Sequence, residues 1–250
     1  MKKSYLSCTF LLVTYFFIMS IPTVALSSEG GLRLAQTRVI FNSDNNNVNV
    51  AIKNNSQKVY LIKVNIMNTP EGNDAALPSP PFMVRPPIFR LEKESQNTAL
   101  IVRNGTSVLP TDRESVFWLS FLAIPSVSKN SHISENMTSA QVSVGIRTVI
   151  KLFYRPAGLP MTFTKAQEKL TFIRHKNSVT VDNPTPYYLT LATLSFDNKP
   201  VDLHDIDPMI APFSSAIFPV DGLTSKAQWA VITDYGDMGQ IFSTSVTTGK

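Results

Sequence analysis

The chain has 250 residues, of which 43% are hydrophobic and 16% are charged, a composition typical of a globular protein with one large domain or two of about 100 residues each. Its formal net charge is +5, and without Lys2 and Lys3 of the leading segment 21 basic and 18 acidic residues leave +3. Nucleic-acid-binding domains usually carry a dense basic stripe. The sequence has no such stripe, so we exclude nucleic acid as a partner.

Residues 1–27 have the pattern of a secretory signal peptide. Lys2 and Lys3 precede the apolar run Leu6 to Ile21, and the small residues Thr23-Val24-Ala25 follow it. We expect cleavage between Ala25 and Ser28. A retained membrane helix is the alternative, but the run is short, and no later segment has the ~18 to 20 apolar residues that span a bilayer. The mature chain is therefore expected to be exported, with no stable membrane insertion.

The single cysteine, Cys8, lies within this expected signal, so the mature chain has no disulfide. Exported domains often use disulfides. Core packing must replace them here, and two sandwich domains of this size bury enough surface to do so.

Residues 28–154 carry the patterns of β-strands. The first strand is expected to contain Leu32, Leu34 and Val39-Ile40-Phe41, and in the next one Val48, Val50 and Ile52 alternate with polar residues. Pro86-Pro87 interrupts a later strand and indicates an edge position, because proline cannot donate to a ladder. Further strands are predicted at Val59 to Met67, Thr98 to Arg103 and Ser115 to Ile124, with a turn at Asn42 to Asn47 and a loop at Thr69 to Pro81.

A long polar loop, Ser126 to Ala140, leads into the longest strand-like segment, Gln141 to Tyr154. The next six residues, 155–160, contain two prolines and a glycine, and we place an interdomain linker there. Strand patterns resume at Leu170 to Ile173, Val179 to Val181, Tyr187 to Phe196, Ala216 to Val220 and Ala230 to Thr233, and Lys165 to Leu170 has a weak signal for one helical turn. The pattern predicts an all-β protein of two sandwich domains, residues 28–154 and 161–250.

Signatures of enzyme chemistry are scarce in the chain. His132, His175 and His204 are scattered without metal-ligand spacing, and Asp205 and Asp207 lie in a proline-flanked loop typical of a turn. Neither a glycine-rich phosphate loop nor a nucleophile elbow is present. We therefore expect no enzymatic activity, no cofactor and no bound metal.

The segment Gln141 to Tyr154 has two interpretations. Val142, Val144 and Ile146 alternate with polar or small residues, so their side chains share one face of an extended strand. These three side chains either fill the core of their own domain or form an exposed apolar edge that another protein pairs with. The alternation alone does not distinguish the two.

Several segments resemble signatures of the periplasmic pilus-chaperone family, which serves chaperone–usher secretion. They run in the family's order through both domains: Thr37-Arg38-Val39-Ile40-Phe41, Asp112-Arg113-Glu114-Ser115-Val116-Phe117-Trp118, Ile150-Lys151-Leu152-Phe153-Tyr154-Arg155-Pro156, Asn183-Pro184-Thr185-Pro186-Tyr187-Tyr188 and Thr233-Asp234-Tyr235-Gly236. The resemblance implies two immunoglobulin-like sandwiches set at an angle, like a boomerang, with a cleft between them.

The resemblance also implies roles for individual residues. Arg38 and Lys151 would bind the C-terminal carboxylate of a pilus subunit in the cleft, through charge-assisted hydrogen bonds. Val142, Val144 and Ile146 would be the donor residues that complete the subunit's unfinished sandwich. An interdomain charge network would contain Glu114, Arg155, Asp234 and Arg103.

The implied function is that of a periplasmic chaperone that binds pilus subunits by donor-strand complementation and delivers them to the outer-membrane usher. A structural pilus subunit or adhesin is the alternative. It is disfavoured because such a protein is usually one incomplete sandwich with a disulfide. The loop Ser126 to Ala140 is longer than in the short-loop branch of the family, yet the cysteine pair typical of longer-loop members is absent. The branch therefore stays open, as does self-capping of free molecules as a homodimer.

Overall fold

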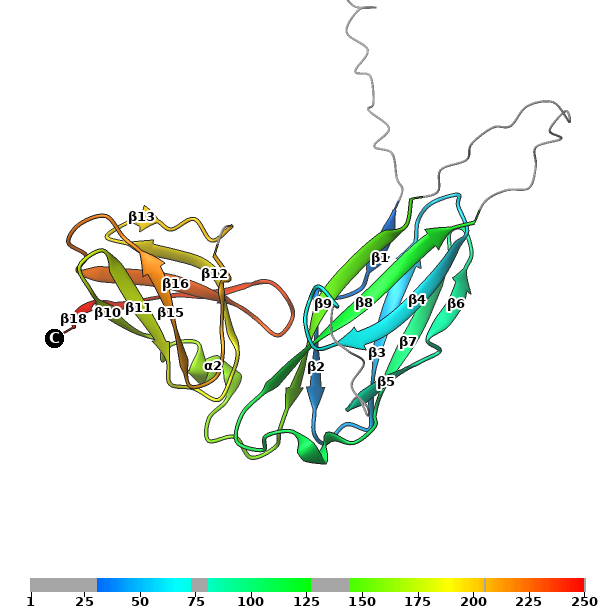
Figure 1. Ribbon diagram of the computed structural model, residues 1–250, viewed down its shortest axis with the longest axis horizontal. Helices are drawn as coiled ribbons and strands as arrows, with labels where there is room; N and C mark the ends of the chain where they lie inside the picture. Colours follow the sequence, from blue (N-terminus) through cyan, green and yellow to red (C-terminus); the bar gives the residue numbers. More distant parts are fainter. Residues whose placement is uncertain (1–30, 73–80, 127–143, 205, 250) are drawn as a thin grey trace, which may run out of the picture.

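The computed structural model describes residues 31–72, 81–126, 144–204 and 206–249. These residues form two β-sandwich lobes that meet at one end and diverge at an angle (Figure 1). The expectation of an all-β fold with two immunoglobulin-like sandwiches at an angle is confirmed. No helix in the described ranges is long and apolar enough to cross a membrane.

The N-terminal lobe packs a four-stranded sheet, in the order β1-β3-β7-β5, on a five-stranded sheet, in the order β2-β9-β8-β4-β6. The strands are β1 (Leu32–Leu34), β2 (Arg38–Asn42), β3 (Asn47–Asn54), β4 (Tyr60–Met67), β5 (Phe82–Arg85), β6 (Ile88–Leu91), β7 (Gln96–Arg103), β8 (Ser115–Pro125) and β9 (Ile146–Arg155), with the short 3₁₀ helix η1 (Thr106–Val108) before β8.

Alternating burial along these strands builds the N-terminal core. On β3, Val50 and Ile52 are buried while Asn49 and Lys53 face solvent. Phe82 lies at the centre of an aromatic group, with ring centroids 5.0 Å from Phe41 and 5.4 Å from Phe117. Tilted and edge-on contacts of this kind stabilise a core beyond the apolar area that they bury.

The first predicted strand is in fact two strands in different sheets, so that prediction was wrong. Leu32–Leu34 pairs antiparallel with β3, whereas Arg38–Asn42 pairs parallel with β9. The residues between the two strands carry the chain from one sheet to the other. The apolar pattern runs through both parts and does not reveal the crossing.

The prediction of an edge position at Pro86-Pro87 is confirmed. β5 ends at Arg85 on the edge of one sheet, and β6 begins at Ile88 on the edge of the other. The two prolines therefore lie where the chain changes sheets, and their missing N–H groups interrupt no ladder.

The C-terminal lobe also has two sheets, in the orders β15-β11-β10-β18 and β13-β12-β16-β17, with β14 paired to β12. Its elements are α2 (Phe163–Ala166), β10 (Thr171–Arg174), β11 (Ser178–Asn183), β12 (Leu189–Phe196), β13 (Lys199–Pro200), β14 (Met209–Ile210), β15 (Ser214–Pro219), β16 (Lys226–Ile232), β17 (Met238–Ser245) and β18 (Thr247–Thr248). Trp229 is buried between the sheets, with Phe172 at 4.8 Å, and donates its indole N–H to the Gln167 carbonyl oxygen at 2.9 Å.

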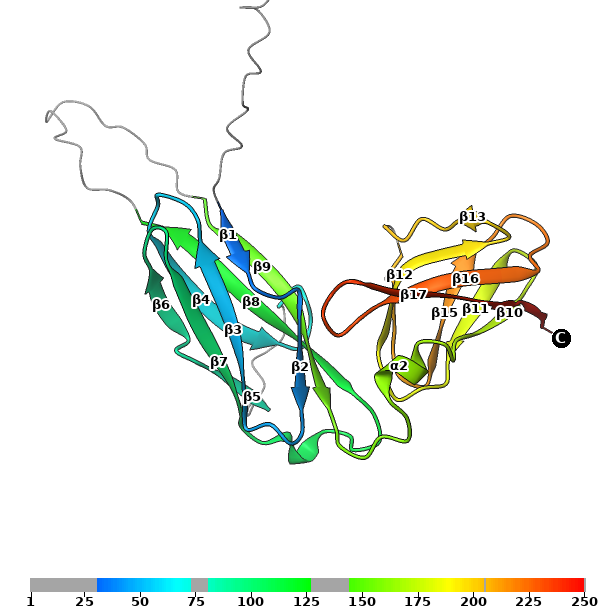
Figure 2. The same ribbon diagram turned by 180° about the vertical axis from the view of Figure 1, so that it is seen from behind.

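The hairpin that joins β16 to β17 extends toward the N-terminal lobe, as both views of the ribbon show (Figure 2). Its tip contains Gly236, where a Cβ atom would overlap the hydroxyl oxygen of Thr37, next to β2. The two lobes therefore touch at the start of β2 as well as through the linker.

Candidate functional site

Arg38 and Lys151 are direct neighbours, as the sequence predicts. They form the first pair of the parallel ladder between β2 and β9. Arg38 is only 9% exposed, and its Nη1 donates to the Ile232 carbonyl oxygen of the C-terminal lobe at 3.3 Å. The pair thus lies where the two lobes meet.

Burial makes both cations costly in the absence of an anion. It lowers the pKa of Arg38, against the opposing effects of the Asp234 and Glu114 carboxylates. Burial also lowers the pKa of Lys151; nearby Asp207 opposes this shift, while the like charge of Arg38 adds to it. Among the described residues no carboxylate forms an ion pair with either cation.

Two buried side-chain polar atoms in the described part of the chain lack a hydrogen-bond partner. They are Arg38 Nε and Thr190 Oγ1. Leu191 pairs with Val231 across β12 and β16, so Thr190 lies beside Ile232, whose carbonyl oxygen meets Arg38. Unsatisfied buried polar groups are rare and costly. Beside Lys151, the unpartnered Nε of Arg38 therefore leaves an unused hydrogen-bond donor where the two lobes meet.

The edge of β9 is open directly beside this pair. β8 pairs with β9 from Ile146 to Tyr154, but β2 covers the other edge only from Lys151 to Arg155. In the described structure no strand covers that edge over residues 146–150. The unpaired backbone groups of such an edge are a template for an added strand.

Two of the three predicted donor residues, Val144 and Ile146, lie at or just before the open end of β9. Val144 is 71% exposed and Ile146 is 52% exposed, whereas Ile150 and Leu152, on the same face of the strand, belong to the domain core. Val142 lies outside the described residues. The alternation therefore continues from the core into an exposed apolar edge.

A hollow of about 390 Å³ lies beside this open edge. Leu34 and Ile52 line one side of it, and Phe121, Ile146 and Ile150 line the other. It opens between the edges of the two sheets, since β1 pairs only with β3 and the start of β9 has no outer neighbour among the described strands. An apolar side chain from another protein would meet the core of the lobe there.

Three of the four residues predicted for the charge network are joined across the lobes. Arg155 Nε donates to Glu114 at 2.7 Å, and its Nη1 and Nη2 donate to the two carboxylate oxygens of Asp234 at 2.7 and 2.8 Å. Burial opposes the charge of Arg155, but its bonds to Asp234 and Glu114 raise its pKa overall. Burial raises the pKa of Glu114, against the attraction of Arg155.

The second oxygen of Glu114 binds the segment Asn183-Pro184-Thr185-Pro186-Tyr187-Tyr188. It accepts a hydrogen bond from the Tyr188 backbone N–H at 2.9 Å. The Asn183 amide nitrogen holds this turn in shape by donating to the carbonyl oxygens of Tyr187 and Ala211 at 2.8 and 2.9 Å. The sequence motif is therefore a rigid turn that presents one backbone donor to the other lobe.

The structure does not bring Arg103 into this cluster. Its guanidinium donates to the Ser43 carbonyl oxygen and to Asn46 Oδ1, both at 2.8 Å, and so fastens the turn between β2 and β3. Arg103, at the end of β7, thus supplies donors to two oxygens of this asparagine-rich turn.

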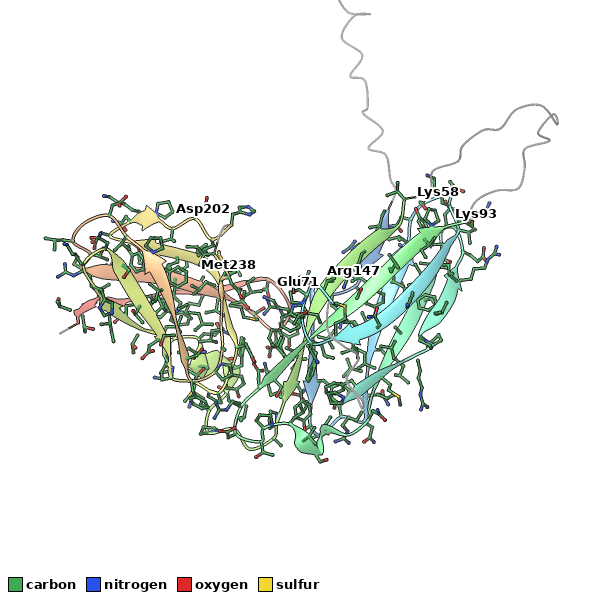
Figure 3. The ribbon with its side chains drawn as sticks, in the orientation of Figure 1. Lys58, Glu71, Lys93, Arg147, Asp202 and Met238 are labelled. Carbon is green, nitrogen blue, oxygen red and sulfur yellow. The ribbon has the colours of Figure 1, made fainter. Side chains whose placement is uncertain are left out.

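Sequence reasoning missed Arg147, which is labelled with Glu71 on the N-terminal lobe in Figure 3. Arg147 donates to Ser120 Oγ at 3.0 Å, to the Glu71 carbonyl oxygen at 3.2 Å and to the Met67 sulfur at 2.7 Å. It thereby holds the turn after β4 against the outer face of β9. A lone arginine that alternates with apolar residues gave no signal of this contact.

A further contact between the lobes joins Arg113 to Phe213. The Arg113 guanidinium lies 4.8 Å from the centre of the Phe213 ring, and Asp112 binds the same guanidinium at 2.7 Å. Cation–π contacts stabilise such junctions modestly. Pattern analysis could not pair residues so far apart in the chain.

Comparison with protein families gives two matches, which together span most of the chain. A family model described as "Pili and flagellar-assembly chaperone, PapD N-terminal domain" matches residues 31–160. One described as "Pili assembly chaperone PapD, C-terminal domain" matches residues 165–241.

Individual proteins agree with these matches. The chain is 34% identical to the chaperone protein HifB of Haemophilus influenzae, over 94% of this chain and 96% of that one. It is 35% identical to the chaperone protein FimC of Escherichia coli K12, over 91% and 90%. The crystal structure of the E. coli chaperone DraB superposes with a TM-score of 0.74 at 31% identity, over 87% of this chain and 97% of that one.

A structure of the SafA pilin in complex with the SafB chaperone, from Salmonella enterica, also matches. Its TM-score is 0.72 at 28% identity, over 87% of this chain and 97% of that one. The family matches thus define the class of this two-lobed protein: it is a chaperone and not an enzyme. The chain belongs to the PapD family of pilus-assembly chaperones.

Proposed function

We propose that this protein is a periplasmic chaperone that captures pilus subunits by adding its own β9 edge to their unfinished sandwich. Residues 1–27 would direct export and be removed, and the mature chain would consist of the domains 28–154 and 161–250 with the linker 155–160. The captured subunit would then pass to the outer-membrane usher.

The observation that carries this proposal is the position of the cation pair at the end of the open edge. β2 is parallel to β9 and begins at the Arg38–Lys151 pair, and the uncovered part of β9, residues 146–150, lies directly before it. A strand that pairs there and ends in a carboxylate at Arg38 and Lys151 must run parallel to β9. It would continue the line of β2 toward the open end of the lobe.

This arrangement would fix the register of the guest strand, the strand of the captured subunit. A carboxylate binds both cations through charge-assisted hydrogen bonds, which are stronger than neutral ones. Once the terminus is held, apolar side chains at positions 142, 144 and 146 fall at fixed distances along the guest groove. Burial of each is worth roughly 1.5 to 3 kcal/mol.

Arg38→Ala and Lys151→Ala test the anchor. We expect either substitution to leave the chaperone folded and to abolish co-purification of the fimbrial subunits encoded beside its gene, when they are co-expressed and pulled down from the periplasm. Lys53→Ala removes an exposed cation from β3 and serves as the matched control. Normal capture by the Arg38 and Lys151 variants would refute the anchor.

A further inference from the structure

Two apolar side chains of β17, Met238 and Ile241, lie on the outer face of the sheet that contains β16 and β17, and neither belongs to the C-terminal core. Trp229 and Val231 point into the C-terminal core, so Ala230 and Ile232 point to the other face. Ile232 pairs with Met238, and Ala230 pairs with Ile241.

A β-bulge places these two partners on one face. Residues 230 and 232 are two apart on β16, but their partners on β17 are three apart, because the register shifts between them. Met238 is 55% exposed and Ile241 is 59% exposed. β17 is also the edge of its sheet as described.

This apolar face is continuous with the cation pair. The carbonyl oxygen of Ile232 accepts a hydrogen bond from Arg38, and Met238 lies opposite Ile232 in the ladder. The hairpin tip between β16 and β17 also rests on Thr37, the residue before Arg38. In Figure 3, Met238 lies in the half of the C-terminal lobe that is turned toward the N-terminal lobe.

We propose that Met238 and Ile241 form a second contact surface for the captured subunit, and that this surface packs on apolar side chains near the subunit's C-terminal carboxylate. The inference rests on the proposed function, because the anchor at Arg38 and Lys151 is what brings that end of the guest beside β17. Two half-exposed apolar side chains near these two cations then lose the rest of their contact with water when the guest binds.

The double variant Met238→Glu/Ile241→Glu tests the surface. We expect it to keep the thermal midpoint of the parent and to bind the co-expressed subunit at least about tenfold more weakly, since burying apolar area of this size corresponds to such a factor. Ile217→Glu is the matched control, because Ile217 is 66% exposed in the same lobe but lies on β15 of the other sheet.

A photo-crosslinking residue placed at 241 or 217 gives a second readout. Crosslinks to the subunit are expected from position 241 and not from position 217, and Arg38→Ala should abolish them. The second surface would be overturned if the double variant captured the subunit normally and position 241 gave no crosslinks. The proposed function would stand in that case as long as Arg38→Ala still abolished capture. Crosslinks from 241 to a second chaperone copy in place of the subunit would also overturn it.

If Arg38→Ala and Val144→Glu both capture the subunit normally, the proposed function itself fails, and that result is distinct from a failure at β17.

Discussion

At the scale of single residues, the site depends on two cations that form no ion pair among the described residues. Arg38 and Lys151 are adjacent, and burial lowers the pKa of both. The carboxylates of Asp234 and Glu114 favour the charged form of Arg38, but they form their ion pairs with Arg155. A carboxylate that enters relieves this cost, because it favours the charged form of each cation.

This coupling predicts that capture depends on pH through Lys151. Its pKa in the free protein is below 10.5, and a bound carboxylate raises it again. The affinity should therefore be constant below the pKa of Lys151 in the free protein. Between that pKa and the higher pKa of Lys151 in the complex, binding requires proton uptake, so the affinity should fall as the pH rises.

The measurement is the affinity for a synthetic peptide with the sequence of the subunit's C-terminal strand, titrated across the alkaline range. Lys151→Arg should flatten the profile, because arginine keeps its proton throughout. An amide-capped form of the peptide should bind weakly at every pH. Equal slopes for Lys151 and its arginine variant would show that another group titrates.

At the scale of the element, one face of β9 is buried in the core at one end and exposed at the other. Ile150 and Leu152 close the N-terminal core, and Val144 and Ile146 continue the same alternation into solvent. The change occurs where β2 stops covering the edge, at Lys151. One pattern of apolar residues therefore runs from the core of the lobe into an exposed edge, which is the part proposed to pair with a subunit.

Val144→Glu separates these two uses. Val144 is largely exposed, so we expect the free energy of unfolding to change by less than about 0.5 kcal/mol. Capture should weaken by about tenfold or more, because burial of a valine is worth roughly 1.5 to 3 kcal/mol and the new charge would enter an apolar groove.

Thermal unfolding and subunit pull-down check the two expectations together, with Val108→Glu as the control at another exposed apolar residue of this lobe. A large drop in the thermal midpoint of Val144→Glu would place the side chain in the core instead.

The strands themselves could be read from the sequence, because half-buried strands such as β3 alternate clearly. Crossings between sheets could not be. The apolar residues of β1 and β2 give one continuous pattern, and only pairing to β3 or β9 separates them. The sequence also could not show whether Val144 and Ile146 are buried or exposed, since the apolar alternation is the same for a core strand and for an open edge.

Site residues could be predicted where they lie in a recognisable sequence motif. They could not be predicted where only the folded structure brings the partners together. Arg38, Lys151, Glu114, Arg155 and Asp234 lie in segments that resemble known signatures. Arg103 was assigned to the network through the resemblance alone, and that assignment was wrong, because its guanidinium binds Ser43 and Asn46 in the turn between β2 and β3.

At the scale of the whole molecule, separate contacts fix how the lobes sit. Arg155 joins Glu114 to Asp234 through short hydrogen bonds, and the rings of Phe153 and Tyr188 make a tilted contact with their centroids 5.8 Å apart. The hairpin tip adds a steric contact between Gly236 and Thr37. Because Asp234 and Gly236 belong to the same hairpin, the charge network and this contact hold that hairpin at two points and fix it against the N-terminal lobe.

Gly236→Ala should therefore disturb the angle between the lobes more than it disturbs either fold. Gly236 has φ +93°, and its Cβ would overlap the hydroxyl of Thr37; Gly222 has φ +88° with open space at that point. Both alanine variants carry a similar backbone strain of about 1 to 3 kcal/mol, so Gly222→Ala is the matched control. Small-angle scattering should show a change in shape for Gly236→Ala alone, with weaker subunit capture. Thr37→Ala removes the overlapping oxygen and should restore part of both. Identical scattering from the two glycine variants would mean that the hairpin tip does not set the angle.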